Sequence, residues 1–428
     1  MGLATDGAAA MMGVHHGAAA YLKQTYNPYM VNVHCMAHRG SLVVSSACAG
    51  VPMTTEADGV LVDTSGYLGK SALRKVGFEL VQEDMVDERL PGIKSFSKIR
   101  FLSRGNAVSA IVKNYLSQQL SSVENKIATC EHQIAASRLQ HQNVSAIEEK
   151  GNAPPASLIE RLSSFRIVGI LFVMVDLLGI LNELNRLFQC RLLTYKGFTE
   201  DLSRTNRKFT RFFLGPNGVQ NPAFKRLLRE FGGGEGGGEA ALRTQLKENP
   251  GGVRVKYKNS NVKILIRLAD LNEVERAARS LAQAVTQELE ERFRAMPLLE
   301  SFSILDPQNF PVDEDLLNDY GTSEMQTLID HFGKNHASFS PSISVDSTMG
   351  EWDNIKDIML TVRRSPAIAN RIIALNAQER KANEAEGWYK YRNVYKLAKI
   401  YIVQPLASIE CERGFSAQKR IKSSSRNR

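Results

Sequence analysis

A few residues near the amino terminus are of types that can bind metal ions or take part in catalysis. Asp6 ends a short apolar run and precedes Gly7. On its own this pair is more typical of a turn than of a catalytic acid. His34, Cys35 and His38 suggest zinc by their spacing, but a structural zinc site has four ligands. The sequence has no Cys-x-x-Cys pair and no second Cys-x-x-His pair, so we expect no metal to be bound.

A second group of candidate residues is basic and lies between Leu202 and Arg229, a stretch without any acid. Lysine and arginine neutralise phosphates, and aromatic rings can stack on bases, so the stretch is a candidate nucleic-acid surface. In the alternative, the phenylalanines face a core and the charges are solvated. We favour the core for Phe209, Phe212, Phe213 and Phe224, and the role of the basic residues stays open. These are Arg204, Arg207, Lys208, Arg211, Lys225, Arg226 and Arg229.

The patterns around the amino-terminal candidate residues predict a fragment of an α/β fold, which would position them. Ala8–Lys23 is rich in alanine and predicts a helix. Tyr29–Val33 alternates apolar and polar residues, which predicts a strand. The dipeptides Asp58-Gly59 and Ser65-Gly66 predict turns. From Asn106 onward, helical periodicity replaces the strand-like patterns.

Two later stretches predict long helices. Ile167–Leu181 is apolar nearly all round, yet it is shorter than the roughly 18 residues of a membrane span and contains Asp176. We therefore expect a buried helix at the centre of a bundle and no membrane contact. Leu271–Phe293 repeats apolar residues every three or four positions and predicts an amphipathic helix. Between these helices, the glycine-rich stretch 231–239 predicts a flexible loop, and the residues after it predict a hairpin at Val253–Lys258 and Val262–Ile266.

Length and composition limit the function classes. The chain has 428 residues, 43% of them hydrophobic, which excludes a mainly disordered protein. The net charge of +9 permits a polyanionic partner. The five cysteines are scattered and odd in number, which argues against a secreted disulfide framework and for a reducing compartment.

Three groups of motifs resemble the hAT superfamily of transposases, in particular its domesticated vertebrate branch similar to zinc finger protein 862. The first group is Ala4–Ala8 (ATDGA) with Val33–Arg39 (VHCMAHR). The second is Met296–Pro307 (MPLLESFSILDP) with Trp388–Leu397 (WYKYRNVYKL). The third and most specific is Gln404–Ser416 (QPLASIECERGFS), which is followed by the ending Arg-Asn-Arg.

The resemblance implies an α/β part plus a large all-α part, in which an incomplete ribonuclease-H-like core is interrupted by a helical insertion. Residues 1–104 would form the start of the core without its first strand, and 105–385 the insertion with its glycine-rich loop at 231–239. Residues 386–428 would be a truncated hAT dimerisation region that completes the core. The resemblance also implies an amino-terminal BED zinc finger, which this sequence does not contain.

The resemblance further assigns roles to individual residues. Asp6 and Glu412 match two of the three acids that gather two metal ions for strand transfer, whereas the first acid has no counterpart in this sequence. Glu412 could equally be an exposed helix charge. Cys35 and His38 match a motif that braces the site, with core packing as the alternative. Phe101 stands where the family has a tryptophan that stacks near flipped bases.

The resemblance and the residues together lead to a hypothesis and two alternatives. We expect a nuclear, catalytically inactive protein that acts through dimerisation or through a related hAT-derived partner, with DNA as a further candidate partner and no cofactor. Candidate dimerisation residues are Trp388, Tyr391, Tyr395 and Phe415. One alternative is an active transposase or nuclease, which would need Mg²⁺. The other is a helical scaffold with no nucleic-acid role.

Overall fold

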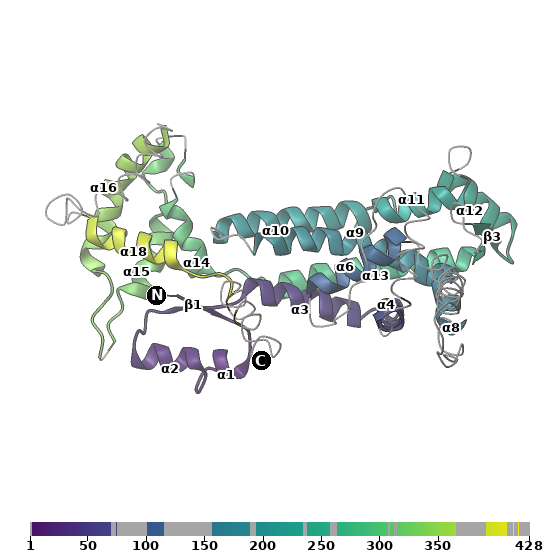
Figure 1. Cartoon of the computed structure of the whole chain (residues 1–428). Helices are drawn as coiled ribbons and strands as arrows, with labels where there is room; N and C mark the ends of the chain where they lie inside the picture. The colour runs from purple at the N-terminus through teal and green to yellow at the C-terminus, as the bar shows by residue number, and fades with distance from the viewer. Residues whose placement is uncertain are drawn as a thin grey trace, which may run out of the picture. The chain divides into compact units, whose positions relative to one another are not determined.

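The computed structural model of the chain is mostly helical, with two small sheets among the residues it describes (Figure 1). These residues are 2–69, 74, 101–114, 156–188, 194–233, 238–256, 263–306, 309–311, 313, 315–336, 338–364, 391–408, 414 and 418. The chain divides into two compact units. Unit 1 contains residues 1–39, 186–201 and 293–428, and unit 2 contains residues 40–185 and 202–292. The sequence-based boundaries at 104 and 385 do not coincide with this division.

The first sheet belongs to unit 1 and consists of two parallel strands. β1 (Gly2–Thr5) pairs with β2 (Val31–His34), with Thr5 opposite His34. Parallel neighbours need a crossover connection, which α1 (Ala9–Met12) and α2 (Ala18–Thr25) supply. The predicted strand and the predicted helical stretch are both present, although the helix is divided in two around Gly13–Gly17.

The remaining described part of unit 1 is helical. Its elements are α14 (Pro297–Ser301), η4 (Phe302–Leu305), η6 (Asp315–Leu317), α15 (Thr322–Phe332), α16 (Val345–Arg364) and α18 (Arg392–Val403). Large aromatic side chains form its core: Phe302, Phe310, Phe332 and Trp352 are almost fully buried. The Trp352 indole N–H donates to the carbonyl of Tyr320 at 3.1 Å, so its burial leaves no unpaired donor.

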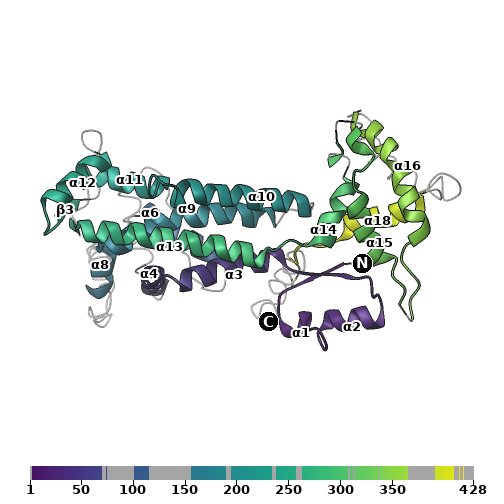
Figure 2. The same ribbon diagram turned by 180° about the vertical axis from the view of Figure 1, so that it is seen from behind.

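Unit 2 is a helical unit with a small hairpin at one end (Figure 2). Its residues form all or most of α3 (Met36–Ala49), α4 (Pro52–Gly69), α6 (Phe101–Asn114), α8 (Ala156–Leu162), α9 (Phe165–Leu187), α10 (Tyr195–Phe209), the π-helix η2 (Thr210–Leu214), α11 (Pro222–Phe231), α12 (Gly238–Glu248) and α13 (Leu268–Arg292). The hairpin pairs β3 (Val253–Lys256) with antiparallel β4 (Lys263–Ile266), as the alternating pattern predicts. Its turn lies outside the described residues.

Helix α9 is the buried central helix that the sequence predicts. Among the described helices it is the one long and apolar enough to cross a membrane, but 72% of its apolar stretch is buried inside the protein. The acid in the middle of the helix, Asp176, has hydrogen-bond partners within the protein. The carboxylate accepts hydrogen bonds from the side chain of Asn221 at 2.8 Å and from the N–H of Ala223 at 2.6 Å, so it caps the start of α11.

The predicted turns at Asp58-Gly59 and Ser65-Gly66 are wrong, because both dipeptides lie inside α4. Asp58 forms a bidentate ion pair with Arg104 of α6, with N–O distances of 2.7 and 3.1 Å. Both side chains are almost completely buried. A buried pair of this kind holds Asp58 in a packed helix face, and this tertiary contact outweighs the local preference of Asp-Gly for a turn.

Candidate functional site

The carboxyl ends of β1 and β2 bring the amino-terminal candidates close together. Asp6 directly follows β1, is exposed, and accepts a hydrogen bond from the N–H of Ala8 at 3.3 Å, as a turn residue does. Gly7 lies so close to His34 that any Cβ at position 7 would overlap the imidazole. Asp6 is therefore both a strand-end acid and a turn residue, and these two interpretations of the sequence are compatible.

Cys35 connects the strand ends to the carboxyl-terminal block. Its side chain is fully buried, and its N–H donates to the carbonyl of Thr5 at 2.7 Å. Its Sγ accepts a hydrogen bond from the N–H of Ser408 at 3.3 Å, and the N–H of Met36 donates to the carbonyl of Leu406 at 3.0 Å. The chain from 404 to 408 thus lies against the strand ends. Glu412, four residues further on, lies outside the described residues.

His38 contributes an imidazole to the same region from α3. Its ring centroid lies 5.5 Å from that of His34, with the two rings tilted by 38°. Within the described ranges, no group of three or more His, Cys, Asp or Glu side chains comes together in a way that could hold a metal ion. The described strand-end region therefore offers a cysteine buried in the core, two neighbouring imidazoles and one exposed acid.

The phenylalanines of the basic stretch are core residues, as expected. Phe209, Phe213 and Phe224 are fully buried, and Phe212 is half-buried. Arginines at 204, 207 and 211 recur at three and four residues on α10 and its π-helical continuation, which places them on one side of the helix. These three arginines are exposed, as are Arg226 and Arg229 on α11. Unit 2 therefore presents arginines to solvent along both helices.

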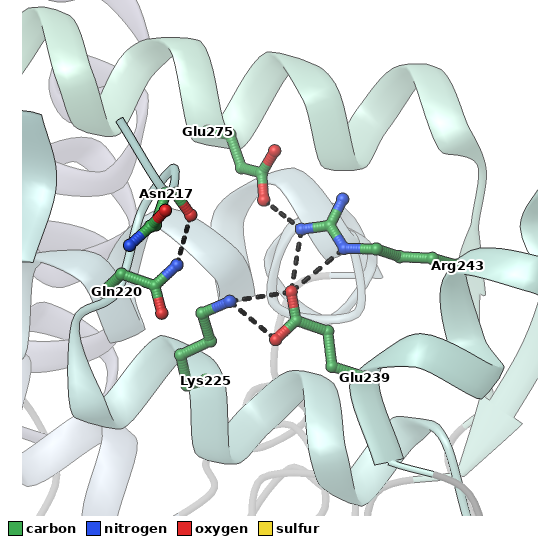
Figure 3. A network of polar contacts seen from close by, with 6 residues as sticks. All are labelled: Asn217, Gln220, Lys225, Glu239, Arg243 and Glu275. Atoms are coloured by element: carbon green, nitrogen blue, oxygen red, sulfur yellow. Dashed lines mark hydrogen bonds and ion pairs between the residues drawn. The ribbon is translucent and has the colours of Figure 1, made fainter. Parts of the chain in front are cut away.

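The two lysines of the candidate set are engaged in ion pairs within the protein. Lys208 pairs with Glu183 of α9. Lys225 donates to both carboxylate oxygens of Glu239, at 2.7 and 2.8 Å (Figure 3). Both ammonium groups therefore already have a carboxylate partner within the protein.

Glu239 is the centre of a four-residue network that joins three helices (Figure 3). Besides Lys225 of α11, it binds Arg243 of its own helix α12 at 2.9 and 3.0 Å. Arg243 in turn pairs with Glu275 of α13. These contacts lower the pKa of the Glu239 carboxyl although burial acts in the opposite direction. The spacing of Glu239 and Arg243 could have predicted their pair from the sequence, whereas nothing local indicates Lys225 or Glu275.

Two of the four candidate dimerisation residues lie on or directly before α18. Tyr391 precedes the helix and Tyr395 lies on it, and both are half-buried. Tyr401 stacks on Phe302 with ring centroids 6.0 Å apart. The helix ends with Ile402 and Val403, whose exposed fractions are 75% and 63%. Trp388 and Phe415 lie outside the described residues, as does the side chain of Phe101, which begins α6.

No known family model matches this chain, and no curated protein or solved structure matches it.

Proposed function

We propose that this chain is a hAT-transposase-related nuclear protein with an incomplete ribonuclease-H-like core, which works by self-association and by sequence-independent contact with DNA, without cleaving it. The core is supported by the parallel β–α–β unit with Asp6 at a strand end. It is supported further by the hydrogen bond from Ser408 to Cys35, which joins segments 373 residues apart in the chain. A fold assembled from both ends of the sequence is what the hAT resemblance implies.

The observation that carries the association proposal is the exposed apolar end of α18. The buried side of this helix contains Val394 and Leu397, with exposed fractions of 4% and 0%, whereas Ile402 and Val403 extend into solvent. Two adjacent branched apolar residues at a helix end form a small hydrophobic contact surface. A second copy of the chain fits it best, because an isologous contact would pair this apolar surface with itself.

Sedimentation velocity tests this proposal. Wild type should sediment faster as its concentration rises, and the double variant Ile402→Glu/Val403→Glu should remain monomeric with an unchanged melting temperature. The double variant Leu316→Glu/Val345→Glu is the matched control, since it adds two charges at other exposed apolar positions of unit 1. A wild type that stays monomeric at high micromolar concentration would refute self-association.

The absence of cleavage is the second part of the proposal. Two-metal strand transfer needs carboxylates that together hold both ions, and Asp6 is an exposed residue with its carboxylate bonded to a local backbone N–H. The purified chain with Mg²⁺ or Mn²⁺ should therefore not nick supercoiled DNA. Nicking that disappears in Asp6→Ala would establish the alternative, an active nuclease.

DNA contact is supported by the exposed arginines of α10 and α11. Phosphate contacts give an affinity that falls steeply with salt concentration. Wild type should bind a duplex of arbitrary sequence with such a salt dependence, and Arg207→Gln/Arg211→Gln should reduce the slope. Undetectable binding at low salt would favour the helical scaffold without a nucleic-acid role.

A further inference from the structure

The Lys225–Glu239–Arg243–Glu275 network has the geometry of an occupied anion site. The Glu239 carboxylate lies between the Lys225 ammonium and the Arg243 guanidinium, with N–O distances of 2.7 to 3.0 Å. The side chains of Lys225, Glu239 and Arg243 are 20% to 31% exposed, so solvent and ligands reach the edge of the network. Arg229 lies one helical turn after Lys225 on α11 and is exposed.

Glu239 lies in the first turn of α12, at the end of the glycine-rich stretch. It directly follows Gly238, which has a φ of 66° and so adopts the left-handed conformation that glycine tolerates best. At the other end of the glycine-rich stretch, a Cβ at Gly232 would overlap the carbonyl of Gly238. The two ends of the stretch thus meet at a point where only glycine fits. The described contacts of the Glu239 carboxylate are with side chains, so a rotation of the Glu239 side chain is enough to release it.

We propose that Glu239 is an intramolecular counter-ion, and that a phosphate of duplex DNA displaces it to bind Lys225 and Arg243. This inference rests on the DNA contact proposed above and assigns a regulation to it. A phosphodiester carries one negative charge and presents two acceptor oxygens, as a carboxylate does. It can therefore replace the Glu239 carboxylate one for one between the two cations.

The charges explain why the network attracts phosphate only after Glu239 has moved away. The four side chains of the network sum to zero, because two cations face two carboxylates. Once Glu239 has moved away, one net positive charge remains, and Arg229 adds another on the adjacent turn of α11. Glu239 competes with the ligand from within the molecule, so it weakens binding at every DNA concentration. Glu239 acts in this way as a built-in competitor.

The test compares two variants that remove the same charge from the same helix. Glu239→Gln frees the two cations, whereas Glu248→Gln changes an exposed carboxylate at the last residue of α12. A labelled 30-base-pair duplex is titrated by fluorescence anisotropy at several salt concentrations. Glu239→Gln should bind roughly 3- to 10-fold more tightly than Glu248→Gln, with a log–log salt slope steeper by about 0.9 for the additional phosphate contact. Adding Lys225→Gln to Glu239→Gln should return the slope to that of wild type.

Each result decides the matter. Equal affinities and slopes for the two glutamine variants would overturn the counter-ion role while leaving DNA contact intact. If wild type and Glu239→Gln both fail to bind, both proposals fall. Far-UV circular dichroism checks folding. If Glu239→Gln is unfolded, Glu239→Asp keeps the charge but withdraws the carboxylate by one methylene, and tighter binding than wild type is again required.

Discussion

Helix α11 of unit 2 and helix α18 of unit 1 begin in the same way. Each starts without a hydrogen bond from its own N-cap side chain. Instead, a carboxylate from a distant helix accepts two hydrogen bonds at the helix start. One comes from the backbone N–H of the second helical residue, and the other comes from the side-chain amide of an asparagine. At α11, Asp176 accepts from the N–H of Ala223 and from the side chain of Asn221. At α18, Glu351 accepts from both the N–H and the side chain of Asn393.

The two caps differ in how many donors they satisfy. The Glu351 carboxylate also accepts the N–H of Val394 at 3.1 Å, and the Asn393 amide makes a further bond to Ser347. Asp176 accepts two hydrogen bonds through a single oxygen. Because an unpaired backbone donor is costly when it is buried, the start of α18 should depend more on its cap than the start of α11. Both helix starts are therefore capped by tertiary partners.

Removing the larger cap should have the largest effect. Glu351→Ala leaves two backbone donors and the Asn393 amide without this acceptor, and should cost about 2–3 kcal/mol of unfolding free energy. Both tryptophans belong to unit 1, and Trp352 is fully buried next to Glu351. Urea unfolding followed by tryptophan fluorescence therefore reports this unit. Glu351→Gln keeps an acceptor for the backbone donors and should lose less. Equal losses in the two variants would contradict the capping role.

Removing the smaller cap should cost less. Asp176→Ala takes the acceptor from the Ala223 N–H and should reduce stability by about 1–2 kcal/mol. Unit 2 contains no tryptophan, so far-UV circular dichroism is the suitable signal. Asp176→Asn retains an oxygen at this position and should be close to wild type near neutral pH. A loss in Asp176→Asn as large as in Asp176→Ala would show that the charge itself is required.

The contribution of the Asp176 cap to stability should also depend on pH. Burial raises the pKa of the Asp176 carboxyl more than its hydrogen bonds and the charge of Arg226 lower it. The folded state therefore binds the proton more tightly than the unfolded chain. The contribution of this group to stability is complete below the ordinary aspartate pKa of about 4 and is lost as pH rises through the folded pKa. The stability of Asp176→Asn relative to wild type should accordingly increase with pH over this window. A difference that stays constant with pH would contradict the prediction.

The smallest expected effect concerns Arg226. Its charge lowers the pKa of Asp176, so Arg226→Gln should raise that pKa further and move the pH window slightly upward. Arg229→Gln is the control, because it makes the same change one turn later on α11. Carboxyl chemical shifts recorded by NMR measure the titration of Asp176 directly. Identical titration curves for Asp176 in the two variants would show that the charge of Arg226 does not affect the pKa of Asp176.

Sequence periodicity predicted those parts of the fold that depend on burial. The apolar run of α9, the repeated stripe of α13 and the alternating residues of the hairpin each indicate their structure locally. The start of α11 is not indicated in this way, because its partner Asp176 is 47 residues away from Ala223. Helix α4 was missed for the same reason, since Asp58 needs Arg104 before its Asp-Gly dipeptide favours a helix.

For the candidate functional residues, the sequence likewise predicted burial but not the long-range contacts. A hydrophobic pattern correctly assigns Phe209 and Phe213 to the core. The pairing of Lys225 with Glu239 depends on how α12 packs against α11, and residue types alone cannot indicate this. The same holds for the contact of Ser408 with Cys35, which joins the two ends of the sequence. The strand-end roles of Asp6, Cys35 and His38 remain predictions of the resemblance.

The π-helical turn η2 at Thr210–Leu214 has a consequence for insertions and deletions in this protein. A π-turn holds one residue more than the matching α-turn, so it is equivalent to a single-residue insertion tolerated within a helix. Phe209 and Phe213, four residues apart, are both fully buried there, with ring centroids 6.0 Å apart. Loss of one codon within this turn would convert it into a regular α-helical turn, and the residues after it would keep their register because the π-turn already absorbs the additional residue. A single-residue deletion within this turn should therefore disturb the fold less than one in the regular part of α10, where it would rotate the following residues by about 100°.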